Sequence, residues 1–211
     1  MSIVSLKHID KKYYDKVIFE DYNLDIQEGE FVSIMGGSGK GKTTLLNIIG
    51  MLDVPDAGEI EICGIKDPKF DKKSGIMLLR NDISYLFQNY GLISSETVLY
   101  NLKLSLYFKN ISSANEKTRI SKVLESVGLA NIENKKVYQL SGGEQQRVAL
   151  AKIMLKSSKL ILADEPTGSL DGKNRDMVLD ILKTLNDEGR TIVVVTHDPE
   201  VARCSKRNIN L

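Results

Sequence analysis

Long apolar runs are missing from this sequence. No stretch approaches the ~20 apolar residues that a membrane span needs, and the apolar part of Met1–Lys7 is too short for a secretory signal. We therefore expect any membrane role to depend on a partner chain. Heptad arrays, internal repeats and low-complexity segments are missing too, which argues against a coiled coil or a repeat fold.

Cysteine is scarce, and neither sign of charge dominates. Cys63 and Cys204 lack metal-ligand spacing, and such sparing use fits a reducing cytosol. The 29 Lys and Arg residues nearly balance the 28 Asp and Glu residues, so no basic field points to nucleic acid, and we expect no nucleic-acid partner. A length of 211 residues suits one α/β unit, with or without an inserted subdomain.

Glycine is concentrated in one stretch, which lies between an apolar run at 31–35 and a helical pattern at 45–51. Its residues are Gly36, Gly37, Ser38, Gly39, Lys40, Gly41, Lys42, Thr43 and Thr44. They fill the pattern G-x-x-x-x-G-K-[ST], in which bare backbone N–H groups cradle phosphate oxygens. We expect Lys42 to reach the β- and γ-phosphates and Thr43 to hold Mg²⁺. A glycine turn that only caps a helix is the alternative, and the complete spacing argues against it.

Strand patterns occupy most of the N-terminal third. Residues 3–31 alternate as in a small antiparallel sheet, which includes Tyr13. Its ring could stack on an adenine or simply pack within a hairpin. The later β-rich run 83–87 ends in Gln88, whose amide oxygen could serve a metal or an attacking water.

Helical spacing replaces strand spacing from about residue 97 to 156, so this region is predicted to be an insertion. Ser141 and Glu144 open its last helix as a capping box, which alone could explain both residues. Capping does not explain Gly142 and Gly143, since glycine in a first helical turn costs roughly 1 kcal/mol relative to alanine. They suggest that something approaches this backbone closely, and a phosphate is the natural candidate.

Carboxylates follow the next buried strand, 159–163. Asp164 and Glu165 thus lie at the carboxyl end of a strand, where α/β sheets bind ligands. They could hold Mg²⁺ and take a proton from water, or merely form a turn. A last apolar strand, 191–196, ends at His197, which could donate to a phosphate or be structural.

These segments, in this order, resemble the ATP-binding cassette (ABC) family along almost the whole chain. The resemblance implies an α/β fold with a P-loop NTPase (RecA-like) core, an N-terminal antiparallel β subdomain and an inserted α-helical subdomain. The nucleotide-binding domain would span 1–211, with the catalytic core at about 1–90 and 157–211 and the helical subdomain at about 91–156. No regulatory tail is expected after Leu211.

The resemblance also assigns the motifs. It makes 36–43 the Walker A loop, Gln88 the Q-loop, 140–144 the signature, 160–164 Walker B and 169–171 the D-loop. Catalytic roles would fall to Lys42, to Glu165 as base and to His197 as switch histidine. ATP would be contacted by Tyr13, Gly36, Gly37, Ser38, Gly39, Lys40, Gly41, Lys42, Thr43, Thr44 and Gln88, and from a second subunit by Ser141, Gly142, Gly143 and Glu144. The ligands of Mg²⁺ would be Thr43, Gln88 and Asp164.

Two such domains would form a homodimer around two ATP molecules and drive a permease, a separate integral-membrane chain. The protein would then lie on the cytoplasmic face of the membrane. Glu144 replaces a frequent glutamine, Lys152 replaces a more usual arginine, and Lys40 is expected to point to solvent. The branch resembled most is that of macrolide and lipoprotein exporters, with bacteriocin export as the narrower guess.

Alternatives remain at this stage. An ATP-switched module that controls cell-wall hydrolases at division would carry the same residues. A small-molecule P-loop kinase would leave Ser141, Glu165 and His197 unexplained. Tyr90, Leu92 and Ile93 could dock a permease or pack the helical insertion.

Overall fold

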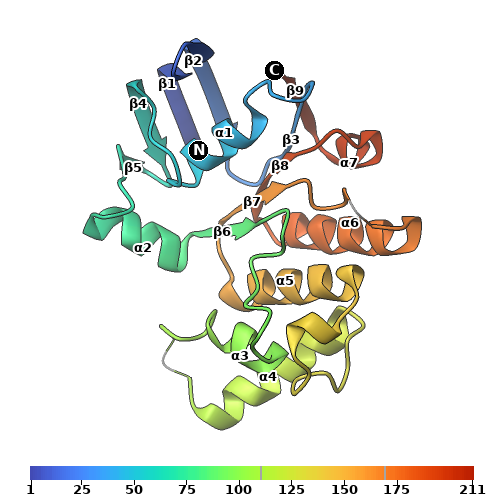
Figure 1. Ribbon diagram of the computed structural model, residues 1–211. Coiled ribbons are helices and arrows are strands. Elements are labelled where there is room, and N and C mark those ends of the chain that lie inside the picture. Colours follow the sequence, from blue (N-terminus) through green and yellow to red (C-terminus); the bar gives the residue numbers. More distant parts are fainter. Residues whose placement is uncertain (110, 169) are drawn as a thin grey trace.

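Two β-sheets of different type organise the chain (Figure 1). The computed structural model describes residues 1–109, 111–168 and 170–211. One sheet has four antiparallel strands in the order β2-β1-β4-β5, which are Lys16–Gln27, Ser2–Tyr13, Ala57–Ile62 and Ile65–Lys66. The antiparallel sheet predicted for the N-terminal region is therefore confirmed.

The second sheet has five strands, and every pairing within it is parallel. In the order β6-β7-β8-β3-β9 its strands are Ile83–Leu86, Leu160–Asp164, Thr191–Val195, Phe31–Met35 and Arg207–Asn210. Strands β7 and β8 are buried at every residue. This explains why they are apolar on both faces and show no alternation.

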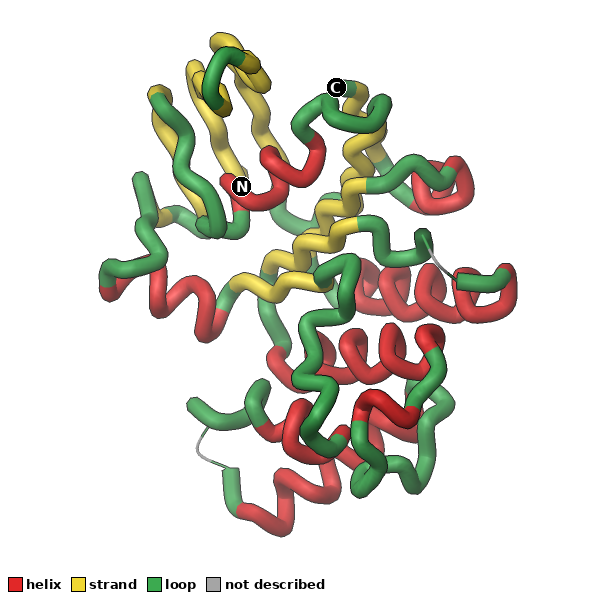
Figure 2. Tube along the Cα trace, viewed as in Figure 1, coloured by secondary structure: helices red, strands yellow, loops and turns green. Residues whose placement is uncertain are grey.

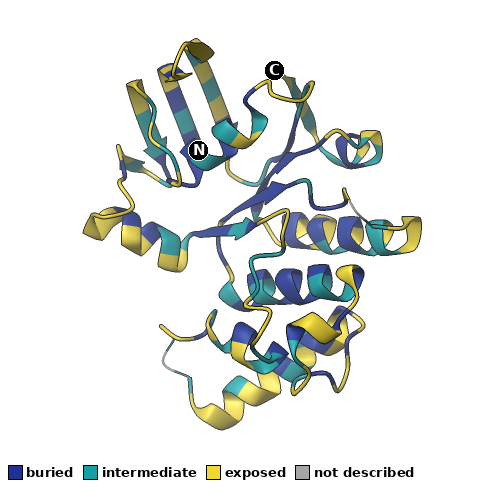
Figure 3. Ribbon diagram, viewed as in Figure 1, coloured by how far each residue is buried: buried dark blue, intermediate teal, exposed yellow. Residues whose placement is uncertain are grey.

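Layers of helix and sheet cover both faces of the parallel sheet (Figure 3). In β7, Leu160 and Leu162 pack with α1 (Lys42–Ile49) and the antiparallel sheet, whereas Ile161 and Ala163 pack with α5 (Gly142–Lys156) and α6 (Gly172–Asp187). The helices of the fold are α1 (Lys42–Ile49), α2 (Lys73–Asn81), α3 (Val98–Lys103), α4 (Ser113–Ser126), the short 3₁₀ helix η1 (Val137–Gln139), α5 (Gly142–Lys156), α6 (Gly172–Asp187) and α7 (Pro199–Cys204). The parallel core thus has the α/β form that the sequence predicts.

Helix α5 joins the sheet to a separate group of helices (Figure 2). Its Ala149, Leu150 and Ile153 pack on the sheet side, and its Val148 and Ala151 pack with α3 and α4. This second group forms the helical insertion of the predicted fold class. Within the described residues, no helix is both long and apolar enough to span a membrane.

Candidate functional site

The glycine loop connects strand β3 to helix α1, as the sequence predicts. Gly41 is the N-cap of α1, with φ at 91°, and no side chain caps the helix there. Since the first N–H groups of a helix lack intrahelical acceptors, they are available to an anion. The Lys42 ammonium lies over the loop and donates to the carbonyls of Gly36 and Gly37 at 2.8 and 2.9 Å.

The antiparallel sheet closes over this loop, and it leaves no room for side chains at the key glycine. A Cβ on Gly41 would lie 2.5 Å from Cγ2 of Ile18 and 3.0 Å from the ring of Phe19. The Lys16 ammonium donates to the carbonyl of Gly39 at 3.2 Å. Two features therefore require glycine at position 41: its positive φ and the close packing of β2 against it.

Two carboxylates end strand β7 beside the loop. Oδ1 of Asp164 accepts from the Thr43 hydroxyl at 3.4 Å, and burial together with the charge of Glu165 raises the Asp164 pKa, against the pull of Thr43 and Lys42. Glu165 has φ of 46°, an uncommon value for a residue with a side chain, and such strain clusters at functional sites.

Glu165 is held by the end of the neighbouring strand β8. Its Oε1 lies 2.8 Å from Nδ1 of His197, and its Oε2 accepts from the Thr196 hydroxyl at 3.3 Å. Its side chain is only 15% exposed, whereas that of His197 is 72% exposed. The His197 backbone N–H also donates to Oε2, at 3.4 Å. The carboxylate is thus positioned by three groups of its own chain: the His197 ring, the Thr196 hydroxyl and this N–H.

A cleft of about 460 Å³ collects these groups. Its lining comprises Gly36, Ser38, Gly39, Gly41, Lys42, Thr43, Thr44, Gln88, Asp164, Glu165, Val195 and His197. Uncapped N–H groups and a lysine suit phosphates, and hydroxyl, amide and carboxylate oxygens suit Mg²⁺. The predicted residues of the Walker A loop, Q-loop, Walker B strand and switch histidine therefore meet at one place, and their chemistry fits Mg²⁺ with a nucleotide.

Some predicted site residues lie outside this lining. Lys40 is exposed, as expected. The Tyr13 ring is 41% exposed, its hydroxyl donates to the Asp53 carboxylate, and the Lys11 ammonium lies 4.7 Å from its centroid. The hydrogen bond to Asp53 and burial raise the Tyr13 pKa, whereas Thr44, at the end of the glycine loop, acts against this shift, so the Tyr13 hydroxyl lies near Thr44.

The predicted signature forms a separate surface, at the start of α5. Ser141 and Glu144 make the expected capping box, since the Ser141 N–H donates to Glu144 Oε2 at 2.8 Å and the Glu144 N–H donates to Ser141 Oγ at 3.3 Å. Ser141 and Gly142 are exposed. In the described part of the chain, the cleft lining contains none of residues 141–144.

Gly143 has a reason within its own chain that the sequence does not reveal. A Cβ there would lie 2.7 Å from Cγ of Asn174, on helix α6. Asn174 is fixed, because its backbone N–H and its Nδ2 donate to Asp171 and its Oδ1 accepts from Arg147. The close approach predicted for this backbone thus includes a side chain of α6, and no local pattern relates positions 143 and 174.

We expect Gly143→Ala to destabilise the protein even without nucleotide. An added methyl group meets a fixed amide, and overpacking of this kind costs about 1–3 kcal/mol. Gly142→Ala is the matched control, since its Cβ would lie 3.0 Å from only the Tyr90 hydroxyl, at the end of a side chain. Thermal unfolding should show a lower midpoint for Gly143→Ala, partly restored by adding Asn174→Ala. An unchanged midpoint for Gly143→Ala would contradict the clash.

Sequence reasoning missed several residues that shape the site: Lys16, Thr196, Val195 and Asn174. The predicted D-loop is described in part: Ser169 lies outside the described residues, whereas Asp171 caps helix α6 by accepting from the Asn174 N–H at 2.9 Å. Of the residues beyond the Q-loop, Tyr90 and Leu92 pack against the core, and Ile93 is 44% exposed.

The sequence matches known proteins over nearly its whole length. A family model described as ABC transporter matches residues 19–168. An ABC transporter ATP-binding protein of Methanocaldococcus jannaschii, MJ0796, is 44% identical, over 99% of this chain and 93% of that protein. The macrolide export ATP-binding/permease protein MacB of Campylobacter jejuni is 41% identical over 99% of this chain, which spans only 33% of MacB.

Solved structures agree with the sequence matches. A dimeric post-hydrolysis state of the ATP-binding cassette MJ0796, bound to ADP and Pi, superposes with a TM-score of 0.90 at 43% identity, covering 99% of this chain and 94% of that one. The structure of cbiO1 from Clostridium perfringens, part of the ABC transporter complex cbiONQ, superposes with a TM-score of 0.85 at 26% identity, covering 99% of this chain and 84% of that one. The predicted P-loop NTPase core is thereby confirmed. The chain belongs to the ABC transporter family, as a cassette that binds and hydrolyses ATP.

Proposed function

We propose that this chain is the ATPase subunit of an exporter, in which two copies close around two Mg-ATP molecules and drive a separate permease. The observation that supports this proposal is the cleft in which Lys42, Glu165 and His197 lie together at the glycine loop. The macrolide-export relatives support the direction of transport. None of the relatives named above is a bacteriocin exporter, so that narrower cargo stays a prediction.

Binding of nucleotide would fall to the glycine loop and its flanks. The N–H groups at the start of α1 and the Lys42 ammonium would bind the phosphates. Thr43, Gln88 and Asp164 would hold Mg²⁺, which supplies positive charge to the phosphate oxygens. Tyr13 would stack on the adenine, since its ring is exposed beside Thr44.

Hydrolysis would use the end of strands β7 and β8. Glu165 would accept a proton from the attacking water, and its fixed position would orient that water. His197, which is mostly exposed beside Glu165, would donate a hydrogen bond to the γ-phosphate. Lys42 would stabilise the charge on the transferred group.

A second copy would complete each site. Ser141 and Gly142 are exposed at a helix N-terminus, yet they lie outside the cleft of their own chain. In a two-fold dimer, residues 141–144 of one subunit would face the phosphates held by the other. The dimeric cassette MJ0796, bound to ADP and Pi, supports this arrangement.

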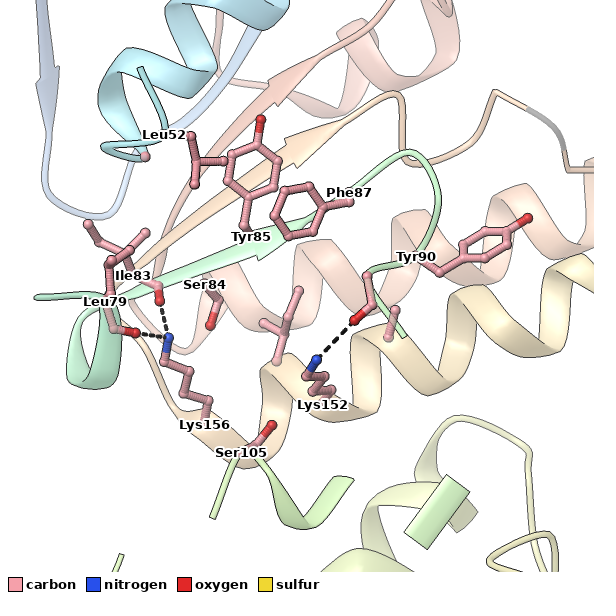
Figure 4. A pocket seen from close by; sticks show the side chains of 14 residues that line it. Leu52, Leu79, Ile83, Ser84, Tyr85, Phe87, Tyr90, Ser105, Lys152 and Lys156 are labelled. Carbon is pink, nitrogen blue, oxygen red and sulfur yellow. Dashed lines mark hydrogen bonds between the residues drawn. The ribbon is translucent and has the colours of Figure 1, made fainter. Parts of the chain in front are cut away.

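Coupling would take place where the helical subdomain, at about 91–156, meets the catalytic core, at about 1–90 and 157–211. A hollow of about 250 Å³ lies there and is lined by Tyr85, Phe87, Tyr90 and Lys152 among others (Figure 4). Phe87 is next to the cleft residue Gln88, so an occupant of the hollow would contact the Q-loop. We propose that the permease docks here and holds the protein at the cytoplasmic face of the membrane.

Co-purification tests this proposal. Tagged Glu165→Gln protein is incubated with ATP and detergent-solubilised native membranes, and the captured proteins are identified by mass spectrometry. We expect a permease encoded beside an efflux component. Capture of a division-site membrane protein with a wall hydrolase, and no transport partner, would instead support the ATP-switched module.

A further inference from the structure

The hollow beside the Q-loop continues into a second one of about 500 Å³. They share Leu79, Ser105, Lys152 and Lys156, and together they form one groove between α2, α5 and the segment 104–109 that follows α3. We call this the α5 groove. Its walls include exposed apolar side chains, of which Leu52 is 52% exposed, Leu104 40% and Phe108 58%.

Four cations line the α5 groove: Arg80, Lys109, Lys152 and Lys156. Three of them are engaged by their own chain. Arg80 lies 4.0 Å from the centroid of Phe108, Lys109 donates to the carbonyls of Leu155 and Lys156, and Lys156 donates to those of Leu79 and Ile83.

Lys152 differs from these three. It comes from the middle of α5, is partly buried, and donates one hydrogen bond, to the Gly91 carbonyl at 3.0 Å (Figure 4). An ammonium has three protons to donate. Within the described residues its other two protons have no acceptor in hydrogen-bond range, so this ammonium can take a further acceptor from within the groove.

No carboxylate balances these charges in the described lining of either hollow. Asp82, which lies near Lys156, is held by Lys159 at 3.1 Å. Burial alone lowers the Lys152 pKa. Burial, with the charges of Lys152 and Lys109, lowers that of Lys156 to about 8, although Asp82 acts against the shift. The contributions of Lys152 and Lys109 to the Lys156 shift reflect cations that lie close together in the groove, whereas the Lys152 shift reflects burial.

We propose that the permease segment in the α5 groove carries an aspartate or glutamate that pairs with Lys152. This rests on the proposed function and adds the chemistry of the docking partner. The apolar walls call for an apolar segment, and the Lys152 ammonium, which donates one hydrogen bond where Lys109 and Lys156 each donate two, calls for a carboxylate. An anionic lipid fits less well, because a headgroup would have to enter between α2, α5 and the segment 104–109.

The test compares capture of the permease by four versions of the tagged Glu165→Gln protein. The first version is the parent, without a further change. The other three add Lys152→Gln, Lys152→Arg or Lys117→Gln, and the last of these is the control, since Lys117 is exposed on α4. Lys152→Gln removes one partner of a buried ion pair, so we expect this variant to capture at least about tenfold less permease than the parent. Lys152→Arg should capture most of the permease that the parent captures, and Lys117→Gln should capture all of it. ATP binding should be equal in the four proteins.

Coupling with a carbodiimide, which joins an amine to a carboxylate in direct contact, identifies the pair. We expect mass spectrometry to find Lys152 joined to an Asp or Glu in a cytoplasmic segment of the captured permease. Equal capture of the permease by Lys152→Gln would overturn this inference and leave the proposed function intact. Failure of the parent to capture any permease would count against the proposed function itself.

Flotation with phosphatidylglycerol vesicles tests whether an anionic lipid headgroup occupies the α5 groove instead. We expect the parent and Lys152→Gln proteins to bind these vesicles equally weakly. Vesicle binding that Lys152→Gln abolishes would overturn the inference, since an anionic headgroup would then be the occupant.

Discussion

Glu165→Gln is expected to lower ATP hydrolysis by about 100-fold or more, with ATP still bound. The amide keeps the size of the carboxylate but cannot take a proton from water. It can still accept from the Thr196 hydroxyl, which donates to Oε2 at 3.3 Å in the parent. Phosphate release measured at saturating ATP gives the rate, and binding of a fluorescent ATP analogue gives the affinity.

Glu125→Gln is the control for this change, because Glu125 is exposed on helix α4. Its rate should equal that of the parent. If Glu165→Gln keeps more than about a tenth of the parent rate, Glu165 is not the general base. The proton would then have to go to another group in the cleft, of which Asp164 is the nearest carboxylate in sequence.

Lys42→Ala is expected to weaken ATP binding by about 100-fold or more. The Lys42 ammonium, now bound to two loop carbonyls at 2.8 and 2.9 Å, can reach the phosphates with little movement. Charge-assisted hydrogen bonds to phosphate are among the strongest in proteins, so their loss should dominate the affinity. Titration with ATP and Mg²⁺, followed by calorimetry, measures it.

Lys122→Ala is the control, since Lys122 is exposed on α4 and far from the loop in sequence. ATP affinity should be unchanged there. If Lys42→Ala binds ATP as the parent does, the phosphates lie elsewhere and the assignment of the glycine loop is wrong. Thermal unfolding without nucleotide should be compared for both variants, so that a loss of fold is not mistaken for a loss of affinity.

The sequence predicts the cleft well because its chemistry lies in short segments of fixed spacing. Residues 36–43 carry their own backbone requirement, as φ of 91° at Gly41 shows. Asp164 and His197 each end a buried strand, and parallel strands bring their carboxyl ends to one edge of a sheet. Local patterns and this one rule are enough to place the residues together.

Contacts between distant segments are what the sequence leaves out. Nothing near Gly143 indicates Asn174, and nothing near Tyr13 indicates that Asp53 accepts from its hydroxyl. Lys152 stands out in sequence only as a substitution for a more usual arginine. Its uncompensated charge depends on which residues of α2 and of the segment 104–109 line the groove with it, and that is set by packing. The order of strands in the parallel sheet is likewise a tertiary property.

The molecular mass of Glu165→Gln with and without ATP and Mg²⁺ tests the central claim most directly. Light scattering on a sizing column would give it. We expect a monomer of 23.5 kDa without nucleotide and a dimer with it, since each site needs residues 141–144 of a second copy. A protein that binds ATP fully and stays a monomer would contradict the composite site.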